Sequence, residues 1–71
     1  MKIRYSNDAD ILVIELRDGT PVDSIDIKEG IILHLDENDQ PLEIEILDAS
    51  KVVMLKEVNV QTPILKASQG A

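Results

Sequence analysis

The sequence predicts an α+β fold: a five-stranded antiparallel meander sheet with one helix packed on its apolar face. Three observations lead to this prediction. Apolar and polar residues alternate with period two in successive short runs, as in half-buried strands. Turn-forming residues separate the runs at hairpin length. A stretch with helical spacing follows the last run, and it can cover the apolar side of a single sheet.

The alternation occurs in a short N-terminal run and in four further runs, at residues 1–5, 11–16, 24–27, 31–35 and 42–46. The connections between them are rich in Asp, Asn and Gly, which favour tight turns. They are residues 6–10, 18–21, 28–30 and 37–40. Because each connection has hairpin length, each run is expected to pair with the next along the chain. The expected strand order is therefore one to five.

Pairing outward from these turns brings apolar residues opposite one another. The expected pairs are Ile3 with Ile14, Leu12 with Ile27, Ile14 with Ile25, Ile25 with Leu33, Leu33 with Ile44 and Ile31 with Ile46. All the pairs fall on one side of the sheet, and a slip of one residue would turn a whole apolar set toward water. This side, which carries Ile3, Ile14, Ile25, Leu33 and Ile44, is called the apolar face.

The stretch after the last run predicts the covering helix. Asp48 is a suitable N-cap for residues 49–58, and Asn59 and Pro63 end the helical pattern. The apolar stripe of this helix would consist of Val52, Val53, Met54, Leu55 and Val58. Residues 60–65 are too short for a second helix and indicate an arm or an extra edge strand. The expected organisation is one domain over residues 1–58 and a C-terminal arm over residues 59–71.

Composition excludes several classes of protein. The 71 residues carry a formal net charge of −7 and a single aromatic side chain, Tyr5, which disfavour binding to nucleic acid. No Cys and only one His are present, so neither disulfides nor a zinc site can staple so small a domain. No apolar run is long enough to cross a membrane, and a cytoplasmic protein without a cofactor is expected.

The side opposite the apolar face is called the polar face, and its first row is expected to hold Lys2, Glu15, Ser24, His34 and Glu43. Ser24, His34 and Glu43 have the residue types of a nucleophile, a base and an orienting acid. Such a hydrolase would need a pocket completed at a dimer interface, because an open sheet provides neither oxyanion donors nor shelter from water. A solvated row of polar pairs is the alternative, and it favours a protein that is not an enzyme.

The second row of the polar face is expected to hold Arg4, Val13, Asp26, Ile32 and Glu45. The apolar residues Val13 and Ile32 indicate that another chain covers part of this side, and a homodimer is the commonest such arrangement. Acidic residues dominate the rest of the face. Glu15, Asp26, Asp36, Glu43 and Glu45 are the candidate binding residues for a basic protein, and the alternative is that they only maintain solubility.

Two metal hypotheses are set aside. Residues 36–40 place oxygen ligands at alternating positions, but Pro41 stands where a calcium loop needs Gly and Leu47 where it needs Glu. His34 with Glu43 and Glu45 is more typical of a solvated acidic surface than of a transition-metal site. No metal site is therefore predicted.

Three segments resemble a small prokaryotic family, the domain of unknown function 2283. They are residues 5–14, with Tyr5 and the Ala9-Asp10 pair, residues 30–36, and residues 42–50, which end in Ile46-Leu47-Asp48-Ala49-Ser50. The resemblance covers residues 1–52, although Asn7 stands where members commonly carry Pro. It implies no catalytic residues. It does imply an antitoxin-like role beside small toxin-like proteins encoded by neighbouring genes.

Overall fold

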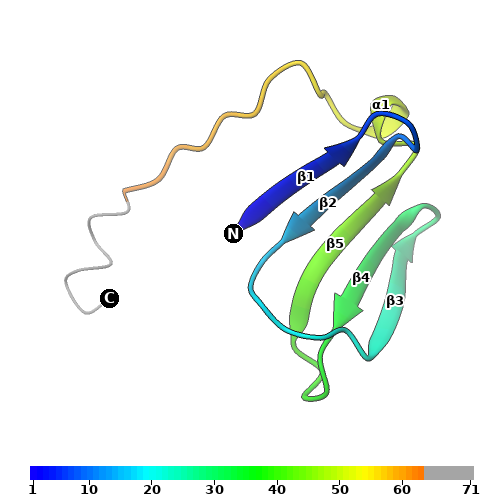
Figure 1. The fold of residues 1–71 in the computed structure, drawn as a ribbon, viewed down its shortest axis with the longest axis vertical. Coiled ribbons are helices and arrows are strands. Elements are labelled where there is room, and N and C mark those ends of the chain that lie inside the picture. Colours follow the sequence, from blue (N-terminus) through cyan, green and yellow to red (C-terminus); the bar gives the residue numbers. More distant parts are fainter. Residues whose placement is uncertain (64–71) are drawn as a thin grey trace.

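The computed structural model describes residues 1–63 and consists of one antiparallel sheet with a short helix at its end (Figure 1). The strands are β1 (Lys2–Ser6), β2 (Ile11–Glu15), β3 (Asp23–Lys28), β4 (Ile31–Leu35) and β5 (Pro41–Leu47), and the helix is α1 (Ala49–Val52). The predicted antiparallel five-stranded sheet is confirmed. Within the described residues, no helix is long and apolar enough to cross a lipid bilayer.

The strand order is β1-β2-β5-β4-β3, so the predicted meander order is wrong at one junction. The expected pairs Ile3 with Ile14, Ile25 with Leu33, Leu33 with Ile44 and Ile31 with Ile46 are all present. However, β2 pairs with β5 rather than with β3. Leu12 therefore lies opposite Ile46 instead of Ile27, and Ile14 lies opposite Ile44 instead of Ile25.

The connection from β2 to β3 is a crossover, not a hairpin. It spans the ends of β5 and β4, where the Leu16 amide donates to the carbonyl oxygen of Leu42 at 2.7 Å and the Val22 amide donates to that of Leu35 at 2.9 Å. Gly19 passes so close to Leu42 that a Cβ atom added there would lie 2.7 Å from the leucine Cδ2 atom. Strands β2 to β5 thus form a Greek key within one sheet.

The exchange places a strand with two buried residues at the centre and a charged strand at the edge. β5 contributes the buried residues Leu42 and Ile46, whereas every residue of β3 is exposed. Asp23, Asp26 and Lys28 of β3 suit an edge, because charged side chains there discourage pairing with other chains. Burial of apolar surface therefore favours β5, rather than β3, beside β2.

The predicted helix over residues 49–58 is much shorter in the structure. α1 ends at Val52, Asp48 has a left-handed backbone (φ 51°), and its side chain makes no capping hydrogen bond. Of the described residues beyond α1, only Val53 and Leu55 pack against the cluster formed by Leu12, Ile46 and Ala49. The helix does not cover the apolar face. Residues 59–63 contain no strand, and the rest of the predicted 60–65 arm or edge strand lies outside the described residues.

Candidate functional site

The polar face contains the predicted residues, but their order across the sheet is different. Its first row runs Lys2, Glu15, Glu43, His34 and Ser24 across the sheet, and its second runs Arg4, Val13, Glu45, Ile32 and Asp26. Both rows keep the same residues because the hairpins set which side chains share a face. The new β2–β5 pairing changes which residues are neighbours.

The possible catalytic residues Ser24, His34 and Glu43 do lie side by side in the first row. The His34 imidazole, however, makes its hydrogen bond to Glu45, with 2.9 Å between Nε2 and Oε1. Among the described residues, no hydrogen bond joins the Ser24 hydroxyl to His34. The imidazole is thus hydrogen-bonded to a residue of the second row and not to Ser24.

The central β2–β5 ladder brings two acids together. Glu15 and Glu43 are direct cross-strand partners. Like charges in such positions are destabilising. Arg4 forms an ion pair with Glu15, whereas Glu43 has no ion pair within residues 1–63. This juxtaposition places a carboxylate with no ion pair in the described residues, that of Glu43, beside the paired carboxylate of Glu15 on the polar face.

The other candidate binding residues differ in their surroundings. Glu45 pairs with His34, and Asp26 has no ion pair in the described part of the chain. Asp36 lies in the β4–β5 turn, where its carboxylate accepts hydrogen bonds from the Asn38 and Gln40 amides and from Arg17. The Gln40 amide, followed by the Arg17 guanidinium, holds the pKa of Asp36 below its ordinary value of 3.8. The Asp36 carboxylate is thus engaged in hydrogen bonds at the turn rather than presented on the open part of the polar face.

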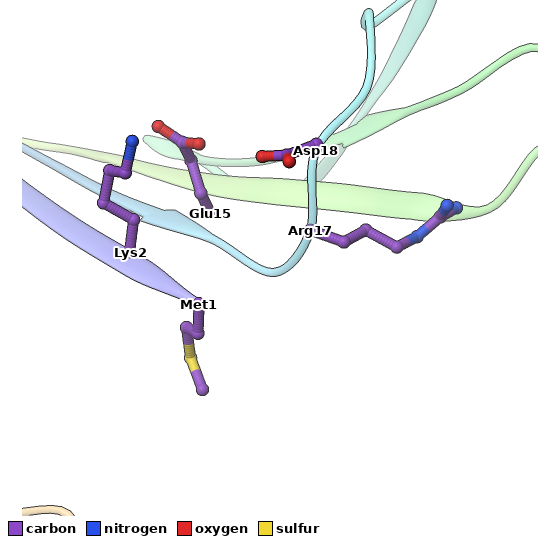
Figure 2. Close-up of a pocket in the computed structure, with 5 residues that line it drawn as sticks. All are labelled: Met1, Lys2, Glu15, Arg17 and Asp18. Atoms are coloured by element: carbon purple, nitrogen blue, oxygen red, sulfur yellow. The ribbon is translucent and has the colours of Figure 1, made fainter.

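A small polar pocket lies where β1 begins and β2 ends. Met1, Lys2, Glu15, Arg17 and Asp18 line it, and its volume is about 90 Å³. Figure 2 shows the Lys2 and Glu15 side chains projecting to the same side, with the Asp18 carboxylate facing them and Arg17 extending away. Pockets that enclose small-molecule ligands are usually larger, about 300–1,000 Å³. Within residues 1–63, no group of three His, Asp or Glu side chains could hold a metal ion.

Sequence reasoning missed a polar junction around Asp10, which links the β1–β2 turn to α1. The Asp10 carboxylate accepts hydrogen bonds from the Tyr5 hydroxyl at 2.7 Å, the Ser50 amide at 2.9 Å and the Ser50 hydroxyl at 2.7 Å. The Asp10 carbonyl oxygen also accepts from the Ala49 amide at 2.9 Å. Asp10 therefore satisfies amides at the start of α1, a function that the side chain of Asp48 was expected to perform.

The backbone of Asp10 has a positive φ of 56°, which Asp and Asn tolerate better than most other residues. Hydrogen bonds from Ser50 and then from Tyr5 hold the pKa of the Asp10 carboxyl below its ordinary value. The same bond to Asp10 raises the pKa of the Tyr5 phenol above its ordinary value. The junction is thus a structural clamp between residues that are 40 positions apart in the chain.

Fold and surface together define a small acidic antiparallel sheet protein with one charged face and one apolar face. The chain belongs to the family described as protein of unknown function (DUF2283), which it matches over residues 2–50. The match contains the whole Asp10 junction, from Tyr5 to Ser50. No curated protein and no solved structure matches the chain.

Proposed function

We propose that this protein is a non-enzymatic interaction module that binds a basic protein through its polar face, in the manner of an antitoxin. The observation that carries the proposal is the direct pairing of Glu15 with Glu43 in the central ladder. Two neighbouring carboxylates are costly in the free protein, and a Lys or Arg from a partner would lower that cost.

The charge distribution supports the same function. Glu45 and Asp26 lie in the adjacent row, and the whole chain carries a net charge of −7. A surface of one sign speeds the approach of an oppositely charged protein and disfavours acidic competitors. The charge therefore favours a basic partner, and the family resemblance implies that a toxin-like protein encoded by a neighbouring gene is the one to test first.

Charge reversal at Glu43 tests the binding proposal. We expect Glu43→Lys to slow association with the product of the adjacent gene by roughly tenfold at low salt, because steering by charge contributes about 10- to 1,000-fold to such rates. The effect should shrink near 1 M salt, where the Debye length is about 3 Å. Stopped-flow mixing at several salt concentrations measures both quantities.

Glu29→Lys is the matched control, because it makes the same charge change in the exposed β3–β4 turn, outside the rows of the polar face. It should leave the rate much closer to that of the unchanged protein. An association rate that changes neither with salt nor with Glu43→Lys would mean that the acids only keep the protein soluble.

The alternative function, a hydrolase that uses Ser24, His34 and Glu43 at a dimer interface, has a separate test. Ser24 is exposed, so Ser24→Ala should change the free energy of unfolding by no more than about 0.5 kcal/mol. Binding of the basic protein should also persist. An ester- or peptide-hydrolysing activity that disappears with this change would favour the enzyme over the interaction module.

A further inference from the structure

The apolar face remains largely open in a single copy of the chain. Ile3 and Tyr5 on β1 are 42% and 40% exposed, and Ile25 on β3 is 49% exposed. The end near Leu12 and Ile46 is covered by Val53 and Leu55, and the opposite end at Leu42 is covered by the β2–β3 crossover at Gly19. The opening therefore extends toward both edge strands, where α1 does not reach.

One layer of sheet with so little cover does not complete a hydrophobic core. Buried residues in the described chain are only Leu12, Leu35, Leu42, Ile46 and Ala49. Stable domains bury the apolar side of a sheet against a second layer, because the conformational entropy lost on folding must be offset by burial. A second layer has to come from outside the described part of this chain.

We infer that a second copy of this chain supplies that layer, with the two apolar faces packed against each other as a sandwich. The distribution of charge between the two faces favours a second copy over a basic protein at this position. The row Ile3, Ile14, Ile44, Leu33 and Ile25 contains no charged side chain, whereas Glu15, Glu43 and Glu45 project from the opposite side. A basic protein would be drawn to the polar face and not to this row.

Face-to-face packing also separates the acids of the two copies. Sheets in a sandwich lie about 10 Å apart, so the outward-facing carboxylates would be roughly 20 Å from those of the other copy. That separation exceeds the Debye length of about 8 Å at physiological salt. Two copies that each carry a net charge of −7 can thus associate through this side with little repulsion.

The flat apolar face alone is smaller than a stable dimer needs, and the groove beside β1 enlarges it. Five strands about five residues long present a flat area of roughly 400 Å². A stable interface needs about 800 Å² of accessible surface per partner. The apolar face continues into a groove of about 520 Å³, lined by Ile3, Tyr5, Leu12, Leu55 and Val58 together with Asn7 and Lys56. This groove extends the apolar surface onto the segment after α1.

A pair of substitutions on one edge strand tests the inference. Ile25 and Ser24 are adjacent, exposed and on opposite faces of β3. Sedimentation should show the unchanged chain at twice 7.9 kDa. Ile25→Asp should raise the dimer dissociation constant at least about 100-fold, because each copy would bury an unpaired charge. Ser24→Asp adds the same charge to the polar face and should change that constant by less than about threefold.

A measurement on the unchanged chain tests the dimer even if the Ile25→Asp variant fails to fold. If the dimer holds the fold together, the melting temperature should rise with protein concentration between about 1 and 100 µM. A monomer at 7.9 kDa whose melting temperature is independent of concentration would overturn the inference. A dimer that survives Ile25→Asp, or that Ser24→Asp disrupts equally, would also overturn it. Neither result depends on binding of a basic protein, so the proposed function is tested separately.

Discussion

Replacing Leu42 with alanine is expected to lower the free energy of unfolding by about 2–5 kcal/mol, the range for truncating a buried leucine. Leu42 is 2% exposed and lies on the central strand β5. Gly19 in the β2–β3 crossover lies against the Leu42 side chain. Because this contact is close, the neighbouring residues cannot readily move into the cavity that alanine would leave. Because small domains are stable by only about 5–15 kcal/mol, this loss would leave the fold marginal.

Urea unfolding followed by circular dichroism measures this effect, provided that all variants are compared at one protein concentration. Val22→Ala is the matched control, because Val22 ends the same crossover but is 63% exposed. It should change the free energy of unfolding by no more than about 0.5 kcal/mol. Equal effects of the two substitutions would show that the crossover does not close over Leu42.

Replacing Asp10 with alanine should lower the melting temperature by several degrees, since it removes the acceptor for Tyr5 and Ser50 at once. Alanine is also sterically disfavoured at the positive φ of this position, whereas asparagine tolerates that backbone conformation better. Asp10→Asn should therefore be milder. Thermal unfolding of the two variants separates the backbone cost from the loss of the carboxylate.

The pH dependence of stability gives a second measurement of this junction. The pKa values of Asp10 and Asp36 are lowered in the folded protein, so their contributions are complete above the ordinary value of 3.8 and are lost as pH falls through the folded pKa. The pKa of Tyr5 is raised, so its contribution is complete below 10.0 and is lost as pH rises through the folded pKa. Asp10→Asn should reduce the alkaline effect, because it removes the negative charge beside Tyr5 but not the desolvation of the phenol, and it should leave the part of the acid effect that Asp36 provides.

Tyr5 is the single tyrosine, and the chain has no Trp, so phenolate absorbance reports the titration of this side chain alone. Its pKa should be above 10.0 and should fall in Asp10→Asn. Ser50→Ala is the matched control, because it removes one hydrogen bond of Asp10 but keeps the bond to Tyr5. A Tyr5 pKa that does not respond to Asp10→Asn would contradict the clamp.

Sequence reasoning succeeded where the interactions are local. The hairpins β1–β2, β3–β4 and β4–β5 were predicted with the registers that the structure has outside two register shifts, between Asp26 and Lys28 and between His34 and Leu35, because short turns and period-two alternation determine them together. The same reasoning failed for β2, whose connection to β3 resembles a long hairpin loop. A signal for the correct order was present in the charges of β3, which suit an edge strand better than a central one.

The candidate site, too, could be predicted from the sequence only in part. The side chains on each face could be predicted, since alternation places them whatever the order of the strands. The pairing of Glu15 with Glu43 could not, because it depends on β5 lying beside β2. The Asp10 junction also depends on a contact between distant segments, as Asp10 meets Ser50 only after the β2–β5 ladder has formed.

By itself, the sequence determined the five strands, the two faces and the members of each polar row, because these follow from the side-chain period of an extended backbone. The tertiary structure decided the strand order, the limited cover of the apolar face and the neighbours of Glu43 and Asp10. The physical reason is that local geometry orients a side chain without choosing its partner. Among strands with equivalent alternation, that choice depends on which arrangement buries the most apolar surface.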